Sequence, residues 1–195
     1  MTPIIRGNSL YKFIDGPTWS EAEANAITQG GHLATINNEA ENDSIYRNFL
    51  TASEGEYWIG LRDPDLSSDM AKDDWIWSSG ENPTYRNFLW FGNGNNEQWR
   101  EEYVSIVSSN NCYPSWGGGE WYAKWNDRRN DGGLIGIAEI PLTLTASIPT
   151  TIKEGAGEFT VNIDLSAGTT AQKHSIIQGT RVWHSVSGID ASDLE

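Results

Sequence analysis

The sequence predicts an α+β domain, with two helices, short antiparallel sheets and a long polar loop, followed by an all-β fragment. The first observation is that the helical patterns precede residue 55, whereas short β-rich runs dominate the rest of the chain. The second is a change of composition near Pro141: nine of the ten tryptophans and 21 of the 27 acidic residues come before it. Such a change marks a boundary between structural units, so we expect one domain over residues 1–141 and a second unit over residues 142–195.

Each of the two expected helices begins at a recognisable N-terminal cap. Thr18 and Glu21 have the spacing in which a hydroxyl and a carboxylate satisfy each other's backbone donors, and this predicts a helix over residues 19–28. Asn38, with Glu41 three residues later, predicts the start of a second helix that ends before residue 53. Both helices therefore belong to the N-terminal part of the domain.

Short runs rich in aromatic and β-branched residues alternate with polar loops in the rest of the domain. They predict strands over residues 10–14, 32–36, 57–61, 75–77, 103–107 and 134–140. Between the fourth and fifth of these runs, residues 78–100 form a long stretch that contains Gly, Asn and Pro and has little periodicity. A loop of that length in a compact domain is usually functional, and its aromatic side chains argue against disorder.

The tail has a different pattern, in which apolar and polar residues alternate over residues 142–146, 159–165 and 182–186. Alternation with a period of two is typical of antiparallel β-sandwiches. We therefore interpret residues 142–195 as part of an Ig-like or Calx-beta-like repeat, or as a spacer, within a larger multidomain chain.

Charge and composition exclude several classes of partner and activity. Acidic residues outnumber basic ones by 27 to 13, which argues against nucleic acid as the partner. No apolar run is long enough to span a bilayer, so we expect no membrane insertion. The single cysteine, Cys112, allows no internal disulfide and has no recognisable partner for nucleophilic catalysis. Because no motif supplies a pair of catalytic carboxylates either, we expect a binding protein rather than an enzyme.

The order of the motifs resembles the C-type-lectin-like family. After the first capped helix comes Gly-Gly-His-Leu-Ala-Thr-Ile at residues 30–36, then Trp-Ile-Gly-Leu at residues 58–61 and Trp-Asn-Asp at residues 125–127. Each motif is short, but their shared order and spacing over residues 7–141 make the match specific. The resemblance implies the C-type-lectin-like fold, in which the two ends of the domain form neighbouring strands and a long loop carries calcium.

The resemblance also assigns a main site for Ca2+. In the family this site takes oxygen ligands from a triplet in the long loop, from an acid six residues later and from the Asn-Asp pair of the Trp-Asn-Asp motif. The matching positions here are Asn93, Asn95, Glu101, Asn126 and Asp127. Five oxygen ligands suit a hard cation that takes six to eight, and they leave positions at which carbohydrate hydroxyls coordinate the ion. The same five residues are thus the predicted carbohydrate-binding residues.

An auxiliary calcium site of the family uses acids that flank the first site. Asp63, Asp73, Asn96 and Glu102 stand near those positions and are the corresponding candidates in this sequence. The register of Asp73 depends on residues 65–72, which have the character of an insertion.

Two departures distinguish the chain from the usual family pattern. The triplet Asn93-Gly94-Asn95 lacks the family's acid and proline, so we expect a lower calcium affinity. Because Asn93 and Asn95 are both amides, the family rule that separates mannose-type from galactose-type ligands does not assign a sugar here. Tyr103 and Ala138 stand where the family usually has cysteines, as is common in bacterial members. We therefore expect aromatic packing to replace the disulfides.

Two functions follow from the resemblance. The first is a calcium-dependent carbohydrate-binding module of a larger secreted or surface-attached adhesin, located outside the cell or at its surface. The second keeps the fold but binds protein or ice through the same loop surface, with calcium structural or absent. Calcium titration and a glycan array separate the two.

Overall fold

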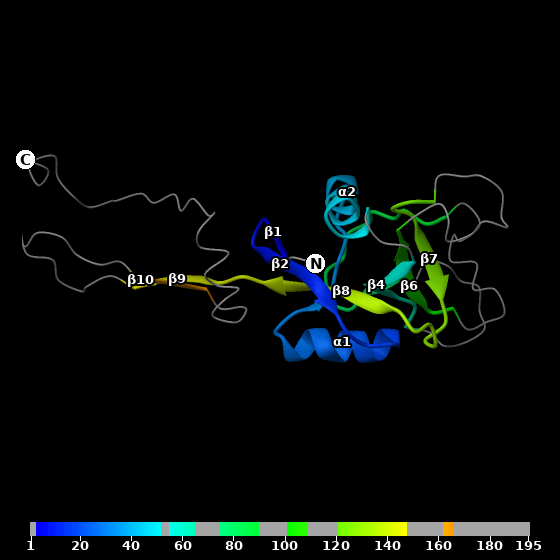
Figure 1. The fold of residues 1–195 in the computed structure, drawn as a ribbon, viewed down its shortest axis with the longest axis horizontal. Coiled ribbons are helices and arrows are strands. Elements are labelled where there is room, and N and C mark those ends of the chain that lie inside the picture. Colours follow the sequence, from blue (N-terminus) through cyan, green and yellow to red (C-terminus); the bar gives the residue numbers. More distant parts are fainter. Residues whose placement is uncertain are drawn as a thin grey trace, which may run out of the picture. The chain divides into compact units, whose positions relative to one another are not determined.

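A computed structural model of the chain describes residues 3–51, 55–64, 75–89, 101–108, 121–147 and 162–165. The chain divides into two units, Met1–Pro141 and Leu142–Glu195. The described part of the first unit contains eight strands, two α-helices and one π-helical turn, and Figure 1 labels most of them. The described part of the second unit is one pair of strands, β9 (Leu144–Ser147) and β10 (Asn162–Leu165), which are antiparallel. The rest of the predicted β-rich tail lies outside the described residues.

One mixed sheet organises the first unit, with β1-β2-β8-β4-β6-β7 as the order of neighbouring strands. Two short strands join off this path, β3 at β8 and β5 at β4. The bounds are β1 Ile4–Arg6, β2 Ser9–Ile14, β3 His32–Leu33, β4 Glu56–Arg62, β5 Ile76–Trp77, β6 Tyr103–Val107, β7 Trp125–Arg128 and β8 Ile135–Pro141. β2 and β8 pair from Ser9 opposite Pro141 to Ile14 opposite Gly136, so strands from the two ends of the domain lie side by side.

The prediction of several short antiparallel sheets is wrong, because a parallel pairing joins the strands into one sheet. β4 and β8 are parallel, with Tyr57 opposite Ile135 and Trp58 opposite Gly136. Strands so far apart in the chain leave no local signal of how they pair, since neither a hairpin turn nor a short crossover connects them. The predicted strand over residues 32–36 is also shorter than expected and ends at Leu33.

Both predicted helices are present, and their caps have the predicted partners. In α1 (Trp19–Thr28) the Thr18 hydroxyl accepts a hydrogen bond from the Glu21 amide at 3.2 Å, and the Glu21 carboxylate accepts one from the Thr18 amide at 3.2 Å. In α2 (Glu39–Ile45) the Asn38 side chain accepts from the Glu41 amide at 3.0 Å. α2 continues into a π-helical turn, η1 (Tyr46–Leu50), which the sequence did not predict. Among the described residues, no helix has the length and apolar character needed to cross a bilayer.

The sheet is buried on two faces, because α1 and α2 lie on opposite sides of β2 and β8 (Figure 1). On one side Trp19 of α1 belongs to a buried cluster with Trp58 and Ala138. On the other side Phe49 of η1 belongs to a larger cluster that includes Ile137. Ile137 and Ala138 are consecutive in β8, and consecutive strand residues point to opposite faces. The nearly continuous apolar run that the sequence shows at this strand thus reflects burial on both sides.

Apolar packing surrounds the two positions of β6 and β8 at which the resemblance expects cysteines. Tyr103 lies with its ring centroid 5.0 Å from that of Trp19, and it packs against the cluster that contains Ala138. Both residues that stand at the family's cysteine positions therefore contribute to the same apolar cluster. The packing joins α1 to β6 and β8 without a covalent link.

Trp125 at the start of β7 lies at the centre of a second aromatic group. Its side chain is 0% exposed. Its ring makes edge-to-face contacts with Trp77 at 5.7 Å, Tyr85 at 5.5 Å and Phe88 at 5.8 Å between centroids. Edge-to-face pairs contribute about 0.5–1.5 kcal/mol each beyond the apolar area that they bury. The Trp-Asn-Asp motif is thus anchored in the core by its tryptophan.

Candidate functional site

Three neighbouring strands reach the same end of the sheet near the predicted ligands. Arg62 at the end of β4 is opposite Tyr103 at the start of β6, and Tyr103 is opposite Arg128 at the end of β7. The Asp63 amide donates a hydrogen bond to the Glu102 carbonyl at 2.8 Å, which continues the β4–β6 pairing beyond the strands. The end of β4, the start of β6 and the end of β7 therefore form one edge of the domain.

The structure brings five of the nine predicted calcium ligands to this edge. Asn126 is opposite Ser105 and Asp127 is opposite Val104 in the β6–β7 pair. Glu101 and Glu102 directly precede β6, and Asp63 directly follows β4. The remaining four predicted ligands, Asp73, Asn93, Asn95 and Asn96, lie outside the described residues.

Asn126 and Asp127 are consecutive strand residues, so their side chains start from opposite faces of β7. Trp125 and Asp127 are buried, and Asn126 and Arg128 are half-buried, as this alternation requires. β7 is the last strand in the order of the sheet, and on its outer side Trp125 forms an isolated bridge with Phe88.

An ion pair that the sequence did not predict holds β7 in place. The Arg128 guanidinium donates to the Glu56 carboxylate at 2.7 Å, and the Ser105 hydroxyl donates to the same carboxylate. Glu56 is 8% exposed, and it links β4 to β7 across β6. The two charged residues are 72 positions apart, so no spacing in the sequence indicates the pair.

The chemistry of the described donors fits calcium better than a softer metal. Glu101, Asn126 and Asp127 offer oxygen atoms as ligands, which hard cations such as Ca2+ prefer, whereas zinc sites are built mainly from Cys and His. Asp127 is 3% exposed, and burial of a carboxylate is costly unless polar or cationic partners surround it. Within the part of the chain that the structure describes, no three His, Cys, Asp or Glu side chains gather as a metal cluster. This includes the four described acids of the predicted set, Asp63, Glu101, Glu102 and Asp127, of which no three gather around one point.

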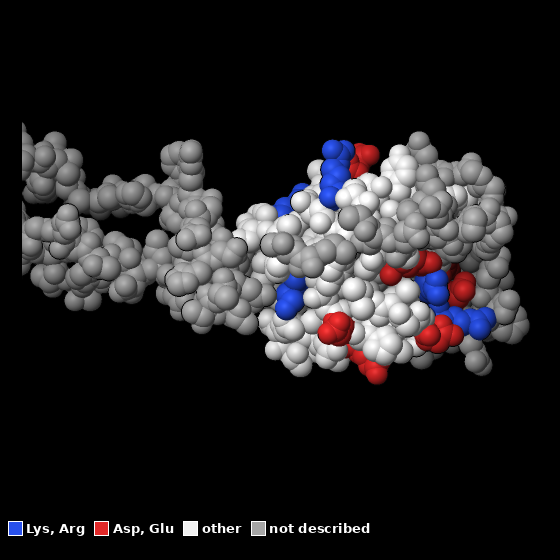
Figure 2. Space-filling model, viewed as in Figure 1, with Lys and Arg blue, Asp and Glu red and all other residues white. Residues whose placement is uncertain are grey.

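Charged side chains of both signs are mixed on one face of the described residues. On the face shown in Figure 2, acidic side chains are interleaved with Lys and Arg, and the described residues form no continuous basic area. Backbone phosphates of nucleic acids are bound by clustered Lys and Arg side chains. This face therefore offers no such surface.

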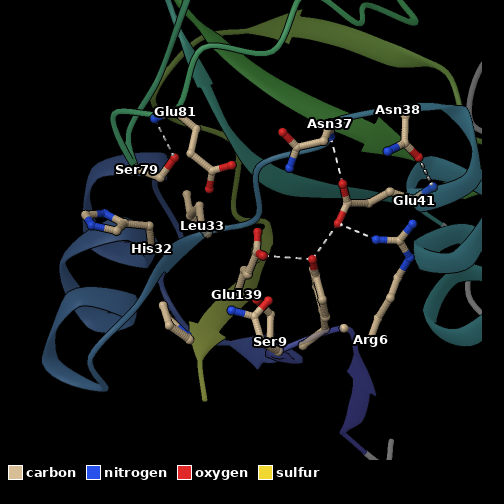
Figure 3. Close-up of a pocket in the computed structure, with 14 residues that line it drawn as sticks. Arg6, Ser9, His32, Leu33, Asn37, Asn38, Glu41, Ser79, Glu81 and Glu139 are labelled. Atoms are coloured by element: carbon tan, nitrogen blue, oxygen red, sulfur yellow. Dashed lines mark hydrogen bonds and ion pairs between the residues drawn. The ribbon is translucent and has the colours of Figure 1, made fainter. Parts of the chain in front are cut away.

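A cavity of about 440 Å³ lies beside β1, β2 and β8, and none of the predicted ligands lines it. Figure 3 shows Arg6, Glu41 and Glu139 around it, with Asn37 beside Glu41 and Glu81 beside Ser79. In the sequence, Glu41 is recognisable only as the partner of a helix cap. No signal in the sequence indicated the cavity, because its walls come from segments more than one hundred residues apart.

One tyrosine hydroxyl in this cavity lies between two carboxylates. The Tyr11 hydroxyl is 2.6 Å from the Glu41 carboxylate and 2.8 Å from the Glu139 carboxylate. Glu41 also accepts from the Arg6 guanidinium at 3.0 Å and from the Asn37 amide at 2.8 Å. A hydroxyl has only one hydrogen to donate, so when it points to Glu41 the contact with Glu139 requires a proton on Glu139.

The pKa directions agree with this assignment. Burial, and then the hydrogen bond to Glu41, raise the pKa of Tyr11, so the hydroxyl stays neutral. Burial raises the pKa of Glu139, although hydrogen bonds from Ser9, Tyr11 and Thr35 oppose the shift. Glu41 faces it across Tyr11, and His32 lies opposite it in the β3–β8 pair.

We expect the domain to lose stability as the pH rises through the pKa of folded Glu139. That pKa lies above the value of an unfolded glutamate, about 4.3, so the protonated form is favoured by folding and its contribution is complete only below that value. Glu139→Gln mimics the protonated carboxyl, and its unfolding free energy should lack this decline. Urea unfolding of both proteins from pH 4 upward measures the difference, and a constant gap between the two curves would contradict the assignment.

Known structures share the fold. The cow CD23 C-type carbohydrate-recognition domain, solved in the presence of a GlcNAc2Man3 oligosaccharide, has a TM-score of 0.56 at 24% sequence identity, over 73% of this chain and 95% of that chain. A calcium-independent type II antifreeze protein has a TM-score of 0.54 at 19% identity, over 71% of this chain and 91% of that chain. At these identities the likeness concerns the fold alone.

Sequence comparison identifies the family. The human protein C-type lectin domain family 4 member D is 30% identical over 138 residues, which make up 71% of this chain and 56% of that protein. The family model of the lectin C-type domain matches residues 15–131, more than half of the chain. This range contains the capped helices, Trp-Ile-Gly-Leu and Trp-Asn-Asp. The chain therefore belongs to the C-type lectin domain family.

Proposed function

We propose that the domain is a calcium-dependent carbohydrate-binding module in which sugar hydroxyls coordinate the ion directly. The observation that carries the proposal is that Asn126 and Asp127 lie in β7, while Glu101 directly precedes β6, the strand that pairs with β7. Asn93 and Asn95 complete the proposed ligand set. Asp63, Asp73, Asn96 and Glu102 are the proposed ligands of an auxiliary site.

The proposed donors suit both the ion and the sugar. Ca2+ takes six to eight oxygen ligands, so five protein ligands leave room for two hydroxyls. A carboxylate accepts strong hydrogen bonds from hydroxyls, and an amide both donates and accepts. Glu101, Asp127 and the asparagines therefore bind the ion through oxygen lone pairs. Their remaining lone pairs and the amide N–H groups form hydrogen bonds with the sugar hydroxyls. Calcium, when bound, supplies the charge that attracts the hydroxyl oxygens.

The setting of the module is part of the proposal. We propose that it belongs to a larger secreted or surface-attached adhesin and acts outside the cell or at its surface, with residues 142–195 as a spacer. The antiparallel pair of β9 and β10 supports a β-rich spacer. Deleting residues 142–195 should leave the lectin domain folded, and circular dichroism of the truncated chain checks this.

A second candidate keeps the fold without the sugar. One neighbour in fold is a calcium-independent antifreeze protein, which supports an ice-binding or protein-binding module with calcium structural or absent. The loop triplet without an acid is the feature of this chain that favours it. Uptake of calcium and binding on a glycan array support the first candidate, and binding that ignores a chelator supports the second.

We expect Asp127→Ala and Glu101→Ala each to weaken calcium binding by more than the roughly 10- to 100-fold that is typical of residues that only support a ligand. Each change removes one of the two carboxylates that balance the charge of the ion. Calorimetric titration with CaCl2 measures the affinity, and a glycan array with and without chelator measures the sugar binding. Asp131→Ala is the matched control, because Asp131 is an exposed acid just beyond β7. If both ligand variants bind calcium as well as the control does, the assigned site is wrong.

A further inference from the structure

The turn before β7 has a backbone conformation that an alanine rarely adopts. Ala123 has φ of 61°, and it is the one non-glycine residue with positive φ among those described. This left-handed conformation costs an L-residue with a Cβ roughly 1–2 kcal/mol. The turn directly precedes Trp125, Asn126 and Asp127, so its shape sets the direction in which β7 begins.

Two asparagine side chains hold this turn by bonding to the same carbonyl. The Ala123 carbonyl accepts from the Asn42 amide nitrogen at 2.9 Å and from the Asn87 amide nitrogen at 2.8 Å. The amide oxygens of the same side chains accept from the next two residues. Asn87 accepts from the Lys124 ammonium at 2.7 Å, and Asn42 accepts from the Trp125 indole at 2.8 Å. We call Asn42, Asn87 and the Ala123 carbonyl the asparagine clamp.

Backbone hydrogen bonds connect the clamp to the sheet on both sides. The Trp125 amide donates to the Asn87 carbonyl at 2.9 Å, and the Leu89 amide donates to the Trp125 carbonyl at 2.8 Å. The Ala123 amide donates to the Val107 carbonyl at 2.9 Å. The start of β7 is therefore fixed between the end of β6 and residues 87–89, with α2 contributing Asn42.

Asparagine is the side chain that this arrangement requires. Each clamp residue donates through nitrogen to one group and accepts through oxygen from another, and only an amide does both at this length. Asn42 is 2% exposed, so its bonds are shielded from competition by water. A leucine has nearly the same shape as asparagine but makes neither bond.

We propose that Asn42 and Asn87 are positioning residues for calcium binding, because the turn that they hold sets the register and direction of Asn126 and Asp127. This inference rests on the proposed function. A shift of one residue along β7 would exchange the faces of Asn126 and Asp127. Binding constellations need their groups held to within about 0.5 Å, which is the task of supporting hydrogen bonds.

Asn87→Leu tests the inference, and Asn25→Leu is its matched control. Asn25 also donates its side-chain amide to a distant backbone carbonyl, that of Asp15 at 2.8 Å, but it lies on α1. We expect Asn87→Leu to weaken calcium binding roughly tenfold, the lower end of the range for supporting residues, and Asn25→Leu to leave it unchanged. Calorimetry is done well below the unfolding temperature, so that a loss of stability alone does not change the measured affinity.

Hydrogen exchange of the calcium-free protein gives a readout that does not depend on the metal. The Leu89 and Trp125 amides should exchange faster in Asn87→Leu, while the Ile137 amide in β8 keeps its rate. Faster exchange together with weaker calcium binding supports the proposal. If the wild-type protein binds calcium and Asn87→Leu binds it with the same affinity, the positioning role alone is overturned. A wild-type protein that takes up no calcium overturns the proposed function itself.

Discussion

Trp125→Ala is expected to lower the free energy of unfolding of the domain by about 3–5 kcal/mol, the cost of removing a fully buried tryptophan. The side chain is 0% exposed, and three aromatic rings pack edge-to-face against it. The change also removes the indole donor of the buried Asn42 side chain. An unpartnered buried acceptor adds to the loss.

Urea unfolding followed by circular dichroism measures this loss, and Trp75→Ala is the matched control. Trp75 is only half-buried, and its described ring partner is Phe88 at 5.4 Å. We therefore expect the control to lose clearly less stability than Trp125→Ala. Equal losses in the two variants would show that Trp125 has no special place in the core.

Glu41→Ala is expected to cost on the order of 3 kcal/mol, because it breaks a buried charged pair by removing one partner. The carboxylate is buried and accepts from the Arg6 guanidinium, the Tyr11 hydroxyl and the Asn37 amide. All three donors lose an acceptor at once. We place the value at the lower end of the usual range, because the Arg6 side chain is 34% exposed and keeps part of its hydration.

Glu39→Ala on the same helix is the control for this prediction. Glu39 is an exposed acid in the first turn of α2, so its removal tests the charge and helix-dipole effects alone. We expect it to change the unfolding free energy by well under 1 kcal/mol. A similar loss in both variants, measured by urea unfolding at pH 7, would show that the network around Tyr11 contributes little.

Local signals predicted the helices well, because a cap and its partner lie within one turn of each other. The bounds of α1 follow from Thr18 and Glu21, and Asn38 marks the start of α2. The same locality explains why β6 was predicted with its observed bounds, Tyr103–Val107. In each case the residues that decide the structure are neighbours in the chain.

Long-range contacts left no such signal. The parallel pairing of β4 with β8, the link between Glu56 and Arg128, and the cavity around Tyr11 all join segments that are distant in the sequence. For the candidate site, the resemblance to the family supplied Glu101, Asn126 and Asp127, whereas the clamp residues Asn42 and Asn87 came only from the structure. From the sequence alone, a polar residue on a helix, such as Asn42, is expected to be exposed to solvent, because the partners that bury it are distant in the chain.

The pairing of β2 with β8 determines how the domain responds to tension. β1 and β8 lie on either side of β2 and both run antiparallel to it, with Arg6 and Pro141 each opposite Ser9. The chain therefore enters β1 and leaves β8 at opposite ends of the ladder. A force that pulls the two flanking segments apart along the strands loads the hydrogen bonds of the ladder together instead of one pair at a time. Single-molecule stretching should accordingly find a higher opening force at this seam than an unzipping geometry would give.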